Sequence, residues 1–201
     1  MAQTHTRQSR LAWTTRLLAR AKELESLKTG DFTLSSGQKS KYYFDGRLLS
    51  LDPEGADLIS AAFLDIVRRS GAEAVGGPAV AAVPIVGALV LRSRLESPGP
   101  GAPGGLAGFF VRGEAKKHGA GKQIEGPVRP GMSVAVFDDT ISTGGSLVMA
   151  VDAIQEFGCK VVATLCVLDR NQGGSDELRR RGLPFHALWA ADGEGNVRVV
   201  E

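Results

Sequence analysis

The sequence predicts an α/β fold in which a central, mainly parallel sheet is flanked by helices. Short apolar runs alternate along the chain with segments of helical periodicity, and this alternation is typical of a parallel sheet that helices cover on both faces. A chain of 201 residues also has the length of one domain. We therefore expect a single domain over residues 1–201.

The clearest βαβ unit lies in the C-terminal half of the chain. Apolar runs predict strands over 133–137 and 161–168, and the spacing of apolar residues predicts a helix over 145–157. The first of these strands runs directly into Asp138 and Asp139, and hydroxyl and glycine residues follow. This polar turn therefore lies at the carboxyl end of a strand, which is where parallel sheets bind ligands.

The composition of the turn is typical of a phosphate site. Unpaired backbone N–H groups and the helix dipole favour an anion at the start of a helix. Gly144 and Gly145 let the backbone approach that anion closely. Hydroxyl donors are also available from Ser142, Thr143 and Ser146. The two acids do not suit a phosphate and are better placed to hold a sugar diol or a hydrated Mg²⁺.

Other interpretations of this turn are weaker. It is not a Walker A loop, because no Gly-Lys-Ser/Thr follows. It is not the dinucleotide fingerprint, because acids stand where the first glycine would be. A strand-to-helix turn capped by Asp and Ser is common, but the full pattern of residues 134–146 rarely arises in that way.

The other elements are expected in order along the chain. Four further segments predict helices, over 11–27, 56–67 (with Pro53 before it and Gly71 after it), 84–95 and 176–181. Short apolar segments predict strands over 32–34, 42–44, 74–76, 106–111 and 185–189. Two polar segments predict loops, a surface loop over 97–105 and a mobile loop over 113–126.

Composition and charge argue against several classes of protein. The formal net charge of +2 gives no general case for a nucleic-acid partner. No apolar run is long enough to cross a membrane, and residues 1–10 lack the apolar core of a secretory signal. Cys159 and Cys166 lie in apolar surroundings, which predicts two buried thiols in a reducing compartment. We therefore expect a cytoplasmic protein with no membrane partner.

Residues 134–146 contain four apolar residues, two acids and a Thr/Ser-Gly loop. This pattern closely resembles the phosphoribosyl-pyrophosphate signature of the type I phosphoribosyltransferases. The resemblance implies the type I phosphoribosyltransferase fold, with a small N-terminal hood in residues 1–50.

A second segment narrows the resemblance. Residues 112–121 read Arg-Gly-Glu-Ala-Lys-Lys-His-Gly-Ala-Gly, which by themselves suggest only a solvated basic loop. They resemble the catalytic loop of the orotate phosphoribosyltransferases, and four residues match it: Arg112, Lys116, His118 and Gly119. Residues 34–45 resemble that family's base-binding segment, and residues 168–170 resemble its strand-end arginine. The similarity follows the chain in order over most of its length.

The resemblance implies transfer of ribose 5-phosphate from phosphoribosyl pyrophosphate to orotate. The products are orotidine 5′-phosphate and pyrophosphate, in a step of UMP synthesis. Mg²⁺ is the implied cofactor, held by Asp138 and Asp139 through water or substrate. The implied assembly is a homodimer in which the mobile loop of residues 113–126 reaches the neighbouring site.

The resemblance also implies a role for each matched residue. The catalytic residues would be Lys116, His118, Asp138 and Asp139. Phosphoribosyl pyrophosphate would be bound by Arg112, Lys116, Lys117, His118, Asp138, Asp139, Thr140, Ile141, Ser142, Thr143, Gly144, Gly145 and Ser146. Orotate would be bound by Ser35, Tyr43, Phe44, Ser142 and Arg170. Core packing remains an alternative for the two aromatic residues, and some family members carry Lys in place of Ser35.

The physical chemistry of these residues agrees with this reaction. The transition state at the sugar C1 is expected to resemble an oxocarbenium ion, with negative charge building on the leaving pyrophosphate. Cationic groups and Mg²⁺ aimed at that charge stabilise it preferentially. His118 can titrate near neutral pH and donate a proton. A closing loop would exclude water and limit hydrolysis of the activated sugar.

Two other functions stay open at this stage. A non-catalytic regulator with the same fold would bind a nucleotide or RNA, but nucleotide binding alone does not require a cationic loop, and RNA binding favours a broad basic face. A phosphoribosyltransferase for a purine or for uracil is the nearer alternative. Arg170 discriminates against it, because an anionic base requires a cation.

The sequence departs from the family pattern at the pyrophosphate end of the substrate. Gly113 replaces the usual Lys beside Arg112. Residues 77–84, Gly-Pro-Ala-Val-Ala-Ala-Val-Pro, occupy the pyrophosphate loop without a charged side chain, so only backbone N–H groups are available there. We therefore expect this protein to bind the pyrophosphate part of the substrate more weakly than typical relatives do.

The first prediction restores the missing charge. Gly113→Lys is expected to raise catalytic efficiency with phosphoribosyl pyrophosphate, because it returns a cation to the pyrophosphate end of the site. Steady-state kinetics of the variant and the wild type would measure the change. An unchanged or lower efficiency would count against this account of the site.

Overall fold

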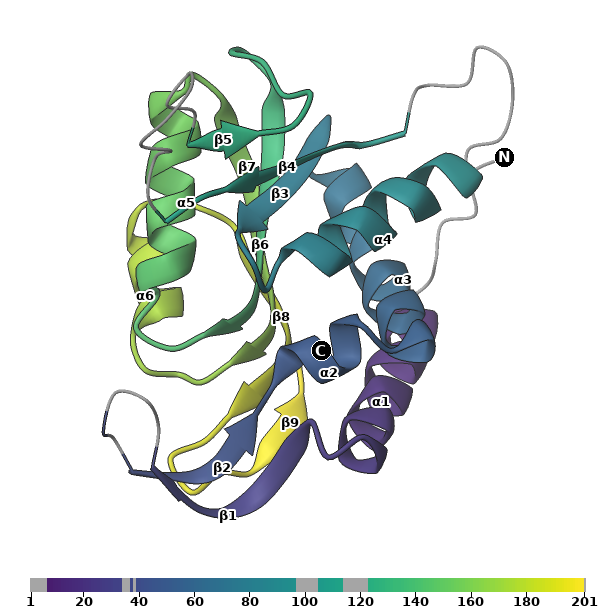
Figure 1. Ribbon diagram of the computed structural model, residues 1–201, viewed down its shortest axis with the longest axis vertical. Coiled ribbons are helices and arrows are strands. Elements are labelled where there is room, and N and C mark those ends of the chain that lie inside the picture. Colours follow the sequence, from purple (N-terminus) through teal and green to yellow (C-terminus); the bar gives the residue numbers. More distant parts are fainter. Residues whose placement is uncertain (1–6, 34–36, 38, 97–104, 114–122, 201) are drawn as a thin grey trace.

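The structure, a computed structural model, describes residues 7–33, 37, 39–96, 105–113 and 123–200 (Figure 1). A seven-stranded sheet forms its centre, with the strand order β5-β4-β3-β6-β7-β8-β9. Its strands are β3 (Ala74–Pro78), β4 (Ala107–Val111), β5 (Ile124–Glu125), β6 (Ser133–Ile141), β7 (Lys160–Asp169), β8 (Phe185–Ala191) and β9 (Val197–Val199). Strands β4, β3, β6, β7 and β8 pair in parallel, and only the edge strands β5 and β9 are antiparallel. The predicted mainly parallel sheet is confirmed.

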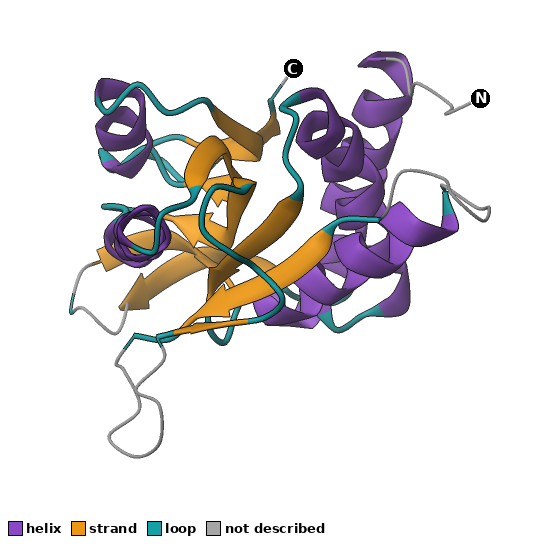
Figure 2. Ribbon diagram, turned by 90° about the horizontal axis from the view of Figure 1, so that it is seen from above, coloured by secondary structure: helices purple, strands orange, loops and turns teal. Residues whose placement is uncertain are grey.

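Helices cover both faces of this sheet (Figures 1 and 2). One face carries α1 (Arg7–Glu23), α3 (Pro53–Arg69) and α4 (Val83–Leu95), and the other carries α5 (Gly145–Glu156) and α6 (Gly174–Arg180). Each face has its own buried apolar cluster. On the first face, the fully buried rings of Phe63 and Phe137 meet edge-on, with their centroids 5.6 Å apart. The predicted α/β architecture with flanking helices is therefore correct.

Within the segment 1–50 that was expected to form the hood, α1 packs on the sheet, and an antiparallel hairpin of β1 (Leu27–Thr33) and β2 (Lys39–Phe44) is followed by the short helix α2 (Gly46–Ser50). The hairpin and α2 together are called the hood. Phe44 joins the hairpin to the sheet, because its ring meets the ring of Trp189 at a centroid distance of 6.0 Å. Gly46 places α2 against the carboxyl end of β6, since a Cβ at Gly46 would lie 2.4 Å from Oδ2 of Asp139. The hood thus lies over the edge of the sheet where the predicted site begins.

Several predicted boundaries change in the structure. The first helix was expected over 11–27, but α1 begins at Arg7 and ends at Glu23, and Leu27 already belongs to β1. Glu25 has a φ of 53°, a left-handed conformation that no helix can continue through. Strand β6 was expected to end at 137, but it continues to Ile141, because its pairing with β7 extends as far as Asp169. Asp138 and Asp139 therefore lie within the strand.

Three short elements were not predicted. Helix α2 has five residues, β9 has three and β5 has two, too few for a periodic pattern to appear in the sequence. Strand β5 lies inside the segment 113–126 that was expected to be a loop. Residues 114–122 of that segment and residues 97–104 of the expected surface loop lie outside the described residues.

Two findings concern the solvent environment of the chain. In the described part of the chain, no helix is both long enough and apolar enough to cross a membrane. Cys159 and Cys166 are both buried free thiols, as expected from their apolar surroundings.

The packing of α3 on the sheet yields a stability prediction. Phe63→Ala would remove a fully buried ring and leave a cavity against Phe137, so we expect a loss of about 3–5 kcal/mol in the free energy of unfolding. Chemical denaturation of the purified variant measures this loss. Leu51→Ala is the control, because Leu51 is 73% exposed. Equal losses in the two variants would contradict this assignment of the core.

Candidate active site

The acid pair lies at the carboxyl end of the central strand β6. Asp138 is buried, at 5% exposure, and its Oδ1 accepts a hydrogen bond of 2.9 Å from the backbone N–H of Asp139. Burial raises the pKa of Asp138 to about 8, and the neighbouring charge of Asp139 adds to the effect. Burial also raises the pKa of Asp139. Two desolvated carboxyls side by side favour a ligand that brings hydroxyl donors or positive charge.

The turn between β6 and α5 forms a phosphate-sized cradle. Gly144 has a φ of 90° and stands at the N-cap of α5, and the N–H of Val148 donates to its carbonyl at 2.8 Å. The amides before Val148 have no helical acceptor, and the first turn of α5 holds no acidic residue, so an anion is favoured there. The cavity at this turn measures about 220 Å³ and is lined by Asp138, Thr140, Ile141, Ser142, Thr143, Gly144, Gly145, Ser146 and Leu147. The structure thus brings the predicted phosphate-loop residues around one space.

The turn after β7 braces this cradle. The N–H of Gly174 donates to the carbonyl of Ser142 at 2.9 Å, and the N–H of Arg170 donates to the carbonyl of Ile141 at 2.9 Å. A Cβ at Gly174 would lie 2.6 Å from the backbone nitrogen of Gly144, so only glycine permits this approach. Arg170 is therefore fixed beside the cradle through its own backbone.

Helix α2 adds residues to the site that sequence reasoning missed. Asp45 caps α2 by accepting from the N–H of Arg47 at 3.1 Å, and its carboxylate also forms an ion pair with the Arg47 guanidinium at 2.8 Å. Among the charges that act on Asp139, Asp45 raises its pKa and Arg47 lowers it. Arg47 is therefore a cation near the acid pair. In the sequence, Arg47 could have been selected as a site residue because it comes directly after the base-binding segment of residues 34–45.

Arg170 lies between the hood and the sheet. Its Nε donates to the hydroxyl of Tyr42 at 2.9 Å, and its guanidinium carbon lies 4.7 Å from the centroid of the Tyr42 ring. It lines a cavity of about 600 Å³ together with Asp31, Lys39, Ser40, Lys41, Tyr42, Asn171, Gln172, Asp192 and Gly193. No acidic side chain of the described residues lies within ion-pair distance of Arg170. An arginine in this state suits an anionic ligand.

The predicted base-binding residues have different surroundings. Tyr43 is 39% exposed, and its ring lies 5.7 Å from that of Phe32. Phe44 is half-buried against Trp189. Ser142 lines the phosphate cradle, and Ser35 lies outside the described residues. Tyr42, which sequence reasoning did not select, is the aromatic residue that contacts Arg170.

The pyrophosphate end of the site carries little positive charge in the described part of the chain. Residues 77–84 run from the end of β3 into the first turn of α4, and a Cβ at Gly77 would lie 1.8 Å from the carbonyl oxygen of Phe137. The Nε of Arg112 lies 3.4 Å from Oε1 of Glu125. A Cβ at Gly113 would meet no atom within 4 Å, so this position has room for a lysine. Lys116, Lys117 and His118 lie outside the described residues.

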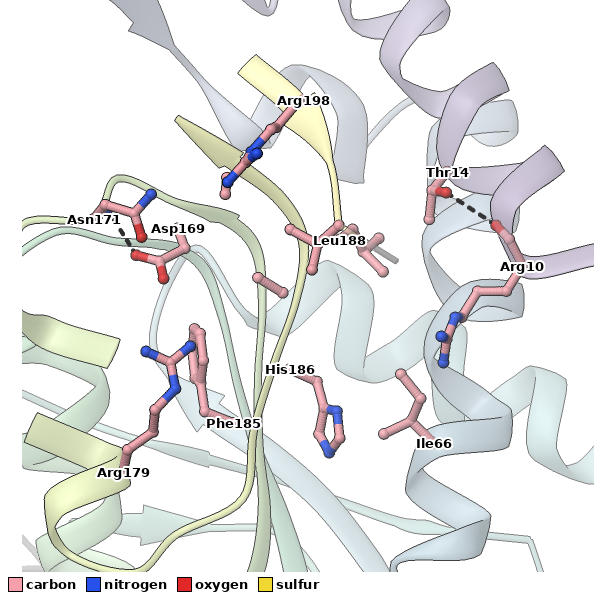
Figure 3. Close-up of a pocket in the computed structure, with 13 residues that line it drawn as sticks. Arg10, Thr14, Ile66, Asp169, Asn171, Arg179, Phe185, His186, Leu188 and Arg198 are labelled. Carbon is pink, nitrogen blue, oxygen red and sulfur yellow. Dashed lines mark hydrogen bonds between the residues drawn. The ribbon is translucent and has the colours of Figure 1, made fainter. Parts of the chain in front are cut away.

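A further cavity of about 330 Å³ lies beside β8 (Figure 3). Asp169 and Asn171 line it from one side, and Arg10, Ile66 and His186 line it from the other. Burial lowers the pKa of His186, and the positive charges of Arg10 and Arg69 lower it further. None of the predicted site residues lines this cavity, so it is separate from the phosphate cradle.

The fold and the site define a class of protein. A parallel sheet ends in a glycine-rich anion cradle, and an acid pair lies near the carboxyl end of the same strand, just before the cradle, which is typical of an α/β protein that binds a phosphorylated sugar. A family profile described as "Phosphoribosyl transferase domain" matches residues 53–181. The chain belongs to this family, and its sequence relatives place it among the orotate phosphoribosyltransferases.

Those relatives match most of the chain. It is 42% identical over 172 residues to a protein of Rhodopirellula baltica named orotate phosphoribosyltransferase, covering 83% of this chain and 86% of that protein. It is 39% identical over 175 residues to the Aquifex aeolicus protein of the same name, covering 86% and 92%. Among solved structures, the orotate phosphoribosyltransferase of Mycobacterium tuberculosis, in complex with Fe(III) dicitrate, is 31% identical with a TM-score of 0.72, covering 87% of this chain and 94% of that one.

The buried acid pair predicts a pH-dependent stability. An unfolded aspartate titrates near a pKa of about 3.9, whereas Asp138 in the folded protein has a pKa of about 8. Between these pH values the folded protein holds a proton that the unfolded chain has released. The free energy of unfolding therefore falls as the pH rises through this window, by at most about 1.4 kcal/mol per pH unit from this group.

Asp138→Asn removes this titration. We expect the variant to become increasingly more stable than the wild type between about pH 4 and about pH 8. Chemical denaturation at several pH values measures the difference. Asp176→Asn is the control, because that side chain is 81% exposed. The same pH slope in Asp138→Asn and the wild type would contradict the buried, proton-holding state of Asp138.

Proposed function

We propose that this protein transfers ribose 5-phosphate from phosphoribosyl pyrophosphate to orotate, giving orotidine 5′-phosphate and pyrophosphate. One observation carries the proposal. The phosphate cradle, the acid pair and an arginine with no acidic partner among the described residues meet at one edge of the sheet. These three features suit the three parts of the product, its phosphate, its ribose and its anionic base. The names of the relatives support the same reaction.

The sugar phosphate would occupy the cradle and the acid pair. Its 5′-phosphate is expected to accept hydrogen bonds from backbone N–H groups and hydroxyls of residues 140–146. The ribose hydroxyls would donate to Asp138 and Asp139, which have no cation bound to either carboxylate among the described residues. Because the cradle is braced from β7, the ribose C1 would be held in a fixed position toward the base.

The residues of the site fit a divalent cation that is shared with the substrate. The described residues include no cluster of three His, Cys, Asp or Glu side chains that could hold a metal by themselves. Mg²⁺ is often bound by one or two carboxylates together with substrate phosphates, and two buried carboxyls with raised pKa values suit that arrangement. Asp138 and Asp139 would hold Mg²⁺ through water or substrate, where it supplies positive charge toward the leaving pyrophosphate.

The segment 113–126 would supply the remaining positive charge. Lys116 and His118 are proposed to act on the leaving pyrophosphate, with Lys117 and Arg112 as further contacts. The resemblance to the family assigns these roles. Cations that approach the pyrophosphate as its charge develops lower the barrier preferentially.

Arg170 would select the base. Its guanidinium lines the cavity between the hood and the sheet, and a planar fork of N–H donors suits the carboxylate of orotate. Ser142, from the cradle, and Tyr43, from the hairpin, are proposed to contact the same base. Phe44 and Ser35 are proposed as further contacts on the strength of the family resemblance. A base without a negative charge would leave Arg170 uncompensated, which disfavours uracil and purines.

A homodimer is proposed as the working assembly. Val83, Leu91 and Leu95 are exposed on one side of α4, at 37%, 61% and 66%, and Val80 just before α4 is 76% exposed. Their spacing places them along one stripe of the helix, which suits packing against a second copy. The segment 113–126 of one subunit would then reach the site of its partner. A cytoplasmic location is proposed with this metabolic role.

The reaction can be followed directly by the loss of orotate absorbance. Purified protein is mixed with phosphoribosyl pyrophosphate, Mg²⁺ and orotate, with uracil and hypoxanthine tested in parallel. We expect turnover with orotate alone, and a loss of at least about 100-fold in the Asp138→Asn/Asp139→Asn double variant, because the ribose contacts disappear.

A matched control is the Asp152→Asn/Asp176→Asn double variant, whose side chains are 56% and 81% exposed on α5 and α6. It is expected to keep wild-type turnover. Turnover with hypoxanthine or uracil instead of orotate would reassign the base. Tight nucleotide binding without turnover of any base would favour the non-catalytic regulator.

A further inference from the structure

The guanidinium of Arg170 is held along one edge by the hood. Its Nε donates to the Tyr42 hydroxyl at 2.9 Å, and its Nη2 lies 3.4 Å from the hydroxyl of Ser40. The guanidinium carbon also lies over the Tyr42 ring, 4.7 Å from its centroid. A guanidinium has five N–H donors in one plane, so these contacts leave its outer donors available for a ligand.

Both of these partners are neutral. The acids that line the same cavity are engaged elsewhere, since Asp31 pairs with Lys41 at 2.6 Å and Asp192 accepts from Asn196 at 2.8 Å. Asp169, the neighbour of Arg170 in the chain, accepts from Asn171 and faces the cavity beside β8 (Figure 3). The contacts to Arg170 therefore orient its guanidinium without neutralising the positive charge.

Tyr42 is itself firmly placed. It is buried, at 5% exposure, and belongs to the apolar cluster that includes Trp189. A Cβ at Gly195 would lie 3.2 Å from Cδ1 of Tyr42, so the β8–β9 turn packs closely on its ring. The backbone of Arg170 is fixed from the other side by its hydrogen bond to Ile141. Both ends of this arginine are thus held by rigid elements.

We propose that Tyr42 is a positioning residue for base recognition. With Ser40 it holds Arg170 through neutral hydroxyls, so that the free donors of the guanidinium face the carboxylate of the base with their charge intact. The inference rests on the proposed function, since it concerns how that site recognises orotate. It adds Ser40 and Tyr42 of β2 to the residues predicted to bind orotate, which were Ser35, Tyr43, Phe44, Ser142 and Arg170.

The test compares substrate dependence in variants of this contact. Tyr42→Phe keeps the ring beside the guanidinium and loses the hydroxyl acceptor. We expect its KM for orotate to rise about tenfold, while the KM for phosphoribosyl pyrophosphate and the melting temperature stay close to wild type. Arg170→Lys is the benchmark and is expected to raise the orotate KM at least as much. Thr33→Val is the matched control, because it removes a hairpin hydroxyl that contacts Lys39 and not Arg170.

A second pair of variants tests the neutral character of the contact. Ser40→Asp keeps an acceptor near Nη2 but adds a negative charge. We expect it to raise the orotate KM more than Ser40→Ala does, because the added carboxylate competes with the base for the same guanidinium. A smaller rise in Ser40→Asp than in Ser40→Ala would overturn this part of the inference.

The outcomes distinguish a failure of the proposed function from a failure of the role proposed for Tyr42. If the wild-type protein consumes no orotate, the proposed function fails and the inference fails with it. If the wild type and Arg170→Lys behave as expected but Tyr42→Phe keeps the wild-type KM, only the role of Tyr42 is wrong. A Tyr42→Phe variant that loses kcat and affinity for both substrates equally would show a general structural role and would also overturn the inference.

Discussion

The parallel register of β6 and β7 is the constraint on which the site depends. Ile141 lies opposite Asp169, so both strands end at the same edge of the sheet. Two backbone hydrogen bonds, from Arg170 to Ile141 and from Gly174 to Ser142, then join the turns that follow the two strands. The close approach of Gly174 to Gly144 requires the absence of a side chain. The anion cradle, the acid pair and the arginine are therefore parts of one rigid frame rather than three separate loops.

This frame carries charges that the described part of the protein does not compensate. On one side, two carboxyls share a desolvated position, and burial raises the pKa of both. On the other side, Arg170 is held by hydroxyls and lies within ion-pair distance of no described acid. Each arrangement costs stability in the free protein. A ligand with a diol or a bound cation at one end would interact with the two carboxyls, and an anionic base at its other end would pair with Arg170. Desolvated carboxyls and an arginine without a described acidic partner therefore indicate a binding site.

The sequence best predicts those parts of the fold and the site whose residues lie close together along the chain. The cradle, the acid pair and the strands around them lie within one short segment, and their order along the chain already implies their geometry. The contact between Arg170 and Tyr42 joins residues 128 positions apart, so no local pattern reveals it. The choice between Tyr42 and Tyr43 depends on which face of β2 turns toward the sheet, and successive strand residues point to opposite faces. Short elements such as α2 were missed for the related reason that five residues show no period.

The pyrophosphate loop has no charged side chain, so positive charge for the leaving pyrophosphate has to come from other parts of the site. Residues 77–84 offer only backbone groups, and Gly77 is pressed against the Phe137 carbonyl, so no side chain can be added at that point without moving β6. Arg112 forms an ion pair with Glu125, and this negative charge partly offsets the positive charge that Arg112 presents to the pyrophosphate. In the proposed reaction, stabilisation of the leaving pyrophosphate would then come mainly from Lys116, His118 and Mg²⁺ in their proposed roles. The described residues therefore supply groups for the ribose phosphate and the base, and the proposed reaction assigns most of the charge that would stabilise the transition state to the cations of the segment 113–126 and to Mg²⁺.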